Sequence, residues 1–258
     1  MDTLLPIGEF QTFLICFSRV AGFISAIPVL MSNQTPAQIK VGLIFLCTLV
    51  LFPIMEPTVQ PVTFGSITFM LLMVSEILLG GMVGLIARMI FTAVEYGGTV
   101  IGYQMGFAAA NIFDPQNERQ LALISQFQNV FAILIFLAID GHHIFLQVAA
   151  ESYTLLPPGV FNISGEAIPY LLSLSSRIFS LGIQFSAPIL VVLLLSGLIL
   201  GLLARVFPQL NVFLLSFPLN IGISFTVIGL TLPIVTILIR REFDDLGNRF
   251  MTVLQLLQ

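Results

Sequence analysis

Long apolar segments, broken by glycine, proline and isolated ionisable residues, set the pattern of this chain. The longest run extends from Ile178 to Ile239 and contains a single charge, Arg205. Uncharged runs such as Gln120–Ile139 and Ile178–Ala204 reach the roughly 20 residues that an α-helix needs to cross the hydrocarbon core of a bilayer. They are continuously apolar and lack the alternation of membrane β-strands. The pattern therefore predicts an all-α integral membrane protein.

The apolar pattern predicts helices of unequal length. The predicted segments are Phe10–Met31, Val41–Met55, Phe64–Val94, Leu121–Ile139, Tyr170–Ala204 and Val212–Ile239. Val41–Met55 is short for a membrane span, whereas Phe64–Val94 and Val212–Ile239 are long, so several of these helices must tilt, break or fold back. Four prolines supply places to kink: Pro28, Pro188, Pro218 and Pro233. We therefore expect kinked helices and helical hairpins.

The charged residues between these segments give a conflicting topology. The connection Gln147–Pro169 is acidic without a base, which by the positive-inside rule places it on the non-cytoplasmic side. Arg205 and Arg240–Arg241 both favour the cytoplasm, yet a single apolar segment separates them. Either the rule is overridden, or Val212–Ile239 forms a shallow hairpin near Pro218–Gly229.

Composition excludes an ordinary soluble globule. Charged residues make up 9% and hydrophobic residues 57% of the chain, and the mean hydropathy is +1.06, whereas soluble domains are about one quarter charged. The net charge is −4 and Lys40 is the single lysine, so there is no basic patch of the kind that binds nucleic acid. Tryptophan is absent, which leaves few anchors for the membrane interface. Much of the surface is therefore expected to contact protein.

Ionisable residues inside apolar segments form one group of candidate site residues: Arg19, Glu76, Arg88 and Arg177. Each would cost a few kcal/mol if it faced lipid at mid-depth, so each needs a partner. Ion pairs and helix caps inside an assembly are the favoured interpretation, and a proton or substrate relay is the alternative.

Small residues recur at a spacing of four and line one helix face in the series Gly98, Gly102, Gly106 and Ala110. Such a face allows close helix approach, because lipid supplies no hydrophobic drive for helix association. Packing within this chain and packing against a neighbouring subunit are equally compatible with the spacing.

Residues suited to catalysis or to cofactor binding do not form a recognisable motif. His142 and His143 follow Asp140–Gly141 and are interpreted as a polar turn that closes the preceding helix rather than as a metal site. A phosphate-binding loop, a nucleophile elbow and a metalloprotease helix are all absent from the sequence. The chain is therefore not expected to be an enzyme or to bind a cofactor or a metal.

The uncharged segment that ends in Asp114–Pro115 interleaves bulky and small residues. Its candidate constriction residues are Met105, Gly106, Phe107, Ile112, Phe113, Asp114 and Pro115. Bulky apolar side chains on a flexible backbone suit a hydrophobic constriction that closes a pore by excluding water. From the residues alone, an ordinary connection between helices is the favoured interpretation and the constriction is the alternative.

Several motifs in this order resemble the R/T subunit family of type III export systems, the family of the flagellar protein FliR. The motifs are Arg19-Val-Ala-Gly-Phe with Ala26-Ile-Pro, Glu76 with Gly80 and Gly84, Met105–Pro115, Asp140-Gly-His-His, Ala187-Pro188, and Ala204–Phe213 with Arg205, Pro208, Gln209 and Asn211. The resemblance covers nearly the whole chain of 258 residues. One departure is Asn220, where many relatives are expected to carry a basic residue.

The resemblance implies a core subunit of the flagellar protein export gate in the bacterial inner membrane and basal body. It implies assembly with FliP and FliQ subunits, contact with FlhB and FlhA, and helical hairpins that look like a FliP-like part fused to a FliQ-like part. It also implies that the loop Gly106–Asn117 plugs a channel for unfolded flagellar proteins. A secondary transporter that uses the intramembrane Glu and Arg residues is the alternative function.

The carboxyl-terminal region after the last apolar segment is predicted to be an amphipathic helix over residues 240–258. Its apolar positions Leu246, Phe250, Val253 and Leu257 fall at helical spacing. A solvated tail with a protein-packed stripe is the alternative. Residues 1–258 are expected to form a single export-gate domain.

Overall fold

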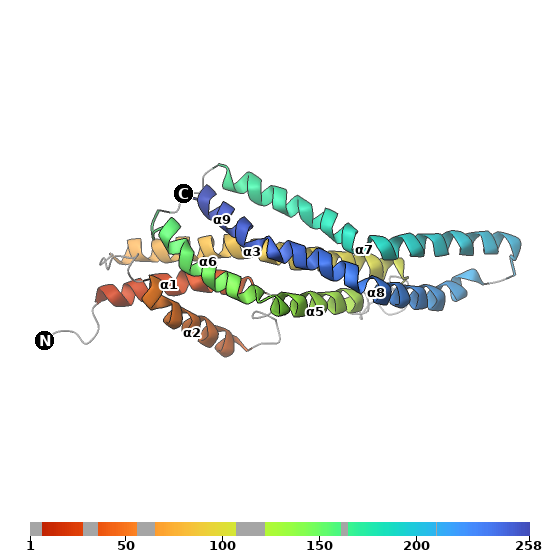
Figure 1. Ribbon diagram of the computed structural model, residues 1–258, viewed down its shortest axis with the longest axis horizontal. Helices are drawn as coiled ribbons and strands as arrows, with labels where there is room; N and C mark the ends of the chain where they lie inside the picture. Colours follow the sequence, from red (N-terminus) through yellow and green to blue (C-terminus); the bar gives the residue numbers. More distant parts are fainter. Residues whose placement is uncertain (1–6, 28–35, 56–64, 107–121, 161–164, 210) are drawn as a thin grey trace. The chain divides into compact units, whose positions relative to one another are not determined.

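The computed structural model describes residues 7–27, 36–55, 65–106, 122–160, 165–209 and 211–258. In these ranges the chain forms α-helices and turns and no β-strand (Figure 1). The helices group into two compact units, each built from separate stretches of the chain. The all-α prediction is confirmed, while the single domain over residues 1–258 stays a prediction.

The first unit contains residues 1–89, 137–174 and 243–258. Its helices are α1 (Ile7–Ser25), α2 (Ala37–Met55), the first part of α3 (Ser66–Gln104), α6 (Gly141–Leu155), the start of α7 (Ala167–Val206) and α9 (Leu246–Leu256). Aromatic rings join neighbouring helices, since Phe13 of α1 lies 5.6 Å from Phe45 of α2 and Phe145 of α6 lies 5.1 Å from Phe250 of α9, measured between ring centroids. Such edge-to-face pairs stabilise the packing beyond the burial of their area.

The second unit contains residues 90–136 and 175–242. It is built from the second part of α3, from α5 (Ala122–Ala138), from most of α7 and from α8 (Val212–Asp244). A short connection joins α7 to α8, and their adjoining ends run side by side as a hairpin (Figure 1). α7 changes direction part-way along, and the proline inside it is Pro188. Proline removes a helical hydrogen bond and is the usual cause of such a kink.

Four helical stretches among the described residues are long and apolar enough to cross a membrane. These are Ala37–Ile54 in α2, Ile67–Gln104 in α3, Ala167–Val206 (α7) and the stretch Leu214–Leu256, which takes in α8 and α9; the bent pair α5 and α6 would make a fifth span. Their surfaces expose many large apolar side chains, such as Leu71 and Leu230 at 66% and 74%. Soluble proteins rarely expose apolar area on this scale, so the prediction of an integral membrane protein is confirmed.

Three helix boundaries differ from the sequence pattern. α3 is 39 residues long and runs past Val94 to Gln104, and α6 occupies part of the predicted connection after Gln147. α8 is continuous through Pro218 and Pro233, so the hairpin considered near Pro218 is not formed. Membrane helices tolerate such prolines because neighbouring groups satisfy the freed backbone carbonyls. The terminal helix predicted over residues 240–258 corresponds to the last turn of α8 and to α9.

The crossing of α1 and α3 depends on two glycines. A methyl group on Gly80 would lie 2.5 Å from the carbonyl oxygen of Arg19 and 2.9 Å from the Cα of Gly22. Both atoms belong to the backbone and cannot move without shifting a helix. The neighbouring Gly81 has nothing within 4 Å of the same position.

We therefore predict that Gly80→Ala lowers the stability of the folded chain in detergent by about 1–3 kcal/mol, the usual cost of overpacking. The matched control is Gly81→Ala, which gains helix propensity in open space and is expected to leave the thermal unfolding midpoint unchanged or slightly raised. Equal midpoints for the two variants would contradict the close crossing.

Candidate functional site

A buried ion pair lies at the centre of the first unit. Arg19 of α1 donates from Nε to Glu76 Oε2 of α3, and the two side chains are 0% and 1% exposed. Arg19 Nη1 donates to Ser152 Oγ at 3.2 Å, and the guanidinium carbon lies 3.9 Å from the ring centroid of Tyr153. A cation over an aromatic face is attracted by the ring quadrupole. One arginine thus holds α1, α3 and α6 together.

Two partners of Arg19 lie in a segment for which the sequence pattern did not predict a helix. Ser152 and Tyr153 lie in α6, inside the predicted connection after Gln147. The polar residues and turn signals of that connection hid the helical spacing of Phe145, Ala149 and Ser152, which are buried in the structure. That spacing was the signal in the sequence that could have revealed them.

The cluster around Arg19 and Glu76 is closed to solvent. Arg19 Nη2 and Glu76 Oε1 are buried and have no hydrogen-bond partner in the described part of the chain. Burying two opposite charges together avoids the large cost of burying either alone. Both side chains of the pair are thus enclosed within the first unit.

A second ion pair joins α7 and α8 in the second unit. Arg177 Nη2 donates to Glu242 Oε1 at 2.8 Å, where Glu242 is 7% and Arg177 48% exposed. The sequence singled out Arg177 and missed Glu242, which follows two arginines and therefore resembles a solvated charge cluster. Arg88 of α3 is exposed and forms no ion pair with the described residues. Its burial against a neighbouring subunit stays a prediction.

The series of small residues at a spacing of four is divided by the end of α3. A methyl group on Gly98 would lie 2.5 Å from Ser125 Cα of α5, so Gly98 packs within the second unit. Gly102 is also buried. Gly106 lies beyond the end of α3 with φ +94°, a conformation that glycine supplies at helix ends. Ala110 falls outside the described residues.

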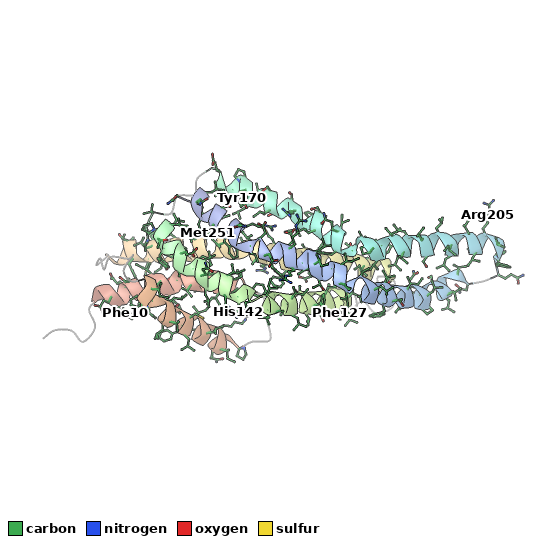
Figure 2. The ribbon with its side chains drawn as sticks, in the orientation of Figure 1. Phe10, Phe127, His142, Tyr170, Arg205 and Met251 are labelled. Carbon is green, nitrogen blue, oxygen red and sulfur yellow. The ribbon has the colours of Figure 1, made fainter. Side chains whose placement is uncertain are left out.

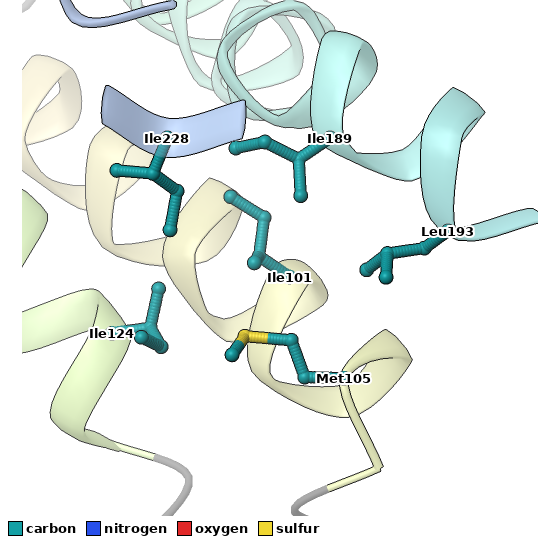
Figure 3. Packing of buried hydrophobic residues seen from close by; sticks show 6 residues of the cluster. All are labelled: Ile101, Met105, Ile124, Ile189, Leu193 and Ile228. Atoms are coloured by element: carbon teal, nitrogen blue, oxygen red, sulfur yellow. The ribbon is translucent and has the colours of Figure 1, made fainter. Parts of the chain in front are cut away.

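The segment that enters the predicted plug starts from a packed core. Ile101 and Met105 are fully buried against Ile124 of α5, Ile189 of α7 and Ile228 of α8 (Figure 3). Met105 is therefore a buried anchor at the edge of the predicted constriction. The other bulky and terminal members of the constriction lie outside the described residues: Phe107, Ile112, Phe113, Asp114 and Pro115.

The motif around Arg205 forms the tip of the α7–α8 hairpin. Arg205 lies in the last turn of α7 and is exposed, and Pro208 and Gln209 follow it (Figure 2). Asn211 Oδ1 accepts a hydrogen bond from the backbone N–H of Leu214 at 3.2 Å and so caps the start of α8. The family motif thus contains a helix end, a turn and a helix start.

Below the tip, a polar bridge and an apolar groove lie between α7 and α8. Ser196 Oγ donates to Asn220 Oδ1 at 3.0 Å, so the amide oxygen of Asn220, where a basic residue is expected in relatives, has a partner inside the hairpin. The groove has a volume of about 320 Å³ and is lined by apolar side chains of both helices, such as Ile199 and Leu219. The hairpin therefore offers an unfilled apolar surface along its length.

The turn predicted at Asp140–His143 is shorter in the structure, because His142 and His143 lie in the first turn of α6. α5 ends at Ala138 and α6 begins at Gly141. His143 Nδ1 lies 3.9 Å from Asp140 Oδ1, and both side chains are exposed.

The Arg19–Glu76 pair yields a stability prediction. Glu76→Gln leaves the Arg19 charge buried without a counter-charge, so we expect a loss of about 3–5 kcal/mol in the free energy of unfolding. The double variant Arg19→Met with Glu76→Gln removes both charges and should recover most of that loss, as measured by unfolding in detergent. The exposed Arg205→Gln is the control and should change little. A double variant no more stable than Glu76→Gln alone would contradict the pairing.

Comparison with known proteins identifies the family. The family model described as bacterial export proteins, family 1, matches residues 10–246. The chain is 34% identical over 241 residues to the flagellar biosynthetic protein FliR of Bacillus subtilis, covering 92% of each chain. It is 32% identical over 238 residues to FliR of Pectobacterium carotovorum, covering 92% of this chain and 90% of that protein, and 29% identical over 230 residues to FliR of Escherichia coli, covering 89% and 87%. The chain therefore belongs to this family of bacterial export proteins, as an all-α integral membrane protein of the flagellar export apparatus.

Proposed function

We propose that this chain is a non-enzymatic core subunit of the flagellar export gate, where it helps to form the channel for unfolded flagellar proteins. FliP-type and FliQ-type subunits are its proposed neighbours in a hetero-oligomer, together with FlhB and FlhA, in the inner membrane at the basal body. The FliP-like and FliQ-like parts expected from the resemblance belong to the same proposal. The observation that carries it is the similarity to FliR proteins over about nine tenths of the chain.

The exposed α7–α8 hairpin supports a role inside an assembly. Its outer face carries bulky apolar residues, and Gly197 and Gly201 have open space above them. Small residues of this kind let a second helix approach closely in a membrane. The groove below the hairpin tip adds a further unfilled apolar surface. Together these features fit helices of neighbouring subunits that pack against the hairpin.

The state of the intramembrane charges argues against the secondary transporter. A relay needs ionisable groups that line an accessible path. Arg19 and Glu76 are enclosed by their own unit, and Arg177 is bound to Glu242. These three groups hold helices together, whereas Arg88 is exposed. Three of the four intramembrane charges thus favour a structural subunit over a carrier.

The buried core before Gly106 supports the plug. Met105 is anchored among apolar side chains of three other helices, and Gly106 then turns the chain through a positive φ. A segment fixed at its start can be held across a channel. The apolar side chains Phe107, Ile112 and Phe113 would close that channel by excluding water.

We predict that shortening the segment Gly106–Asn117 makes the closed assembly leak ions. The measurement is single-channel conductance of the purified hetero-oligomer in planar bilayers. The matched control replaces Phe107, Ile112 and Phe113 with leucine, which keeps the segment length and the apolar closure and should leave the assembly closed. Unchanged conductance of an intact shortened assembly would remove the plug from this proposal.

A further inference from the structure

Three metal-ligating side chains meet at the turn between α5 and α6. One ligand atom from each of Asp140, His142 and His143 lies within 4.8 Å of the others. The two imidazole rings have centroids 4.2 Å apart. These are the two histidines of the entire sequence, so imidazole coordination of a metal by this chain has one possible location.

Asp140 and His142 each lack a hydrogen bond that such a residue usually makes in a folded protein. Asp140 stands at the amino-terminal cap of α6 with φ 56°, but its carboxylate makes no capping hydrogen bond, although capping is the ordinary use of aspartate at a helix start. His142 Nδ1 is buried and has no hydrogen-bond partner in the part of the chain that the structure describes. Buried polar atoms of this kind normally have a partner. The carboxylate of Asp140 thus makes no capping bond and lies 3.9 Å from His143 Nδ1, and one nitrogen of the neighbouring His142 is unsatisfied.

We propose that Asp140, His142 and His143 bind a divalent transition-metal ion of the Zn²⁺ type, with water as the fourth ligand. Two imidazole nitrogens and one carboxylate oxygen suit Zn²⁺ and Co²⁺, whose bonds to such atoms are about 2.0–2.2 Å long. Tetrahedral ligands at that bond length are roughly 3.3 Å apart, somewhat closer than the atoms stand in the structure. Asp140 and His143 are 72% and 68% exposed, so rotation of these two side chains would close the gap.

The bound ion would fix the first turn of α6. It would tie Asp140, which precedes the helix, to two side chains of the first helical turn. Asp140 has a left-handed backbone conformation, which is costly for a residue with a side chain. Metal binding would stabilise that conformation and with it the start of the helix that carries Ser152 and Tyr153.

Metal titration of the full chain tests this site directly. The chain is purified in detergent with an affinity tag that lacks histidine, stripped with a chelator, and titrated with Co²⁺ while its visible absorption is followed. We expect one equivalent of Co²⁺ per chain, with a spectrum of low-coordinate cobalt that added Zn²⁺ abolishes. Absence of such a spectrum in folded protein would overturn the site.

Matched variants separate this site from adventitious binding to carboxylates. Asp140→Asn removes the anionic ligand and keeps a residue that tolerates positive φ, so we expect at least tenfold weaker binding with unchanged helix content by circular dichroism. His142→Gln with His143→Gln should abolish the cobalt spectrum, whereas Glu166→Gln, which removes an exposed acid elsewhere in the first unit, should bind as the natural chain does. Equal binding by the double histidine variant would show adventitious binding only and overturn the site.

Discussion

The ion pair between Arg19 and Glu76 is the interaction on which the first unit depends. Each charge alone would carry a desolvation penalty of several kcal/mol in an apolar interior. Together, with Ser152 and Tyr153 around the guanidinium, they fix the register of α1, α3 and α6. The ion pair therefore gives specificity to helices whose remaining contacts are mostly apolar and nondirectional.

Close backbone approach is the second constraint, because lipid offers no hydrophobic drive for one helix to pack on another. Gly22 and Gly80 bring α1 against α3 in the first unit, and Gly97 meets Gly182 of α7 in the second. At these glycines, backbone atoms of the same chain occupy the space that a side chain would need. A methyl group on Gly197 or Gly201 would meet nothing within 4 Å, so these two glycines of α7 stay open on the surface of the chain.

The sequence predicted the fold class and the intramembrane charges, because long uncharged runs and isolated arginines are strong local signals. It could not pair Arg19 with Glu76, since they lie on helices far apart in the chain, and it missed Glu242 beside two arginines. Helix ends were also hidden: the spacing of small residues continues through Gly106, whereas α3 ends at Gln104. The prolines within α8 suggested a break in the helix, but the helix continues through them. Local pattern thus predicted which segments are helices, and long-range contacts decided where they end and what they hold.

The native mass of the complex formed on co-expression with FliP-type and FliQ-type subunits is the most direct test of the account. This chain is tagged, the complex is purified in mild detergent, and the composition is read from its mass. The account predicts a stable hetero-oligomer with one copy of this chain. A monodisperse particle of this chain alone that moves a small solute across liposome membranes would contradict it.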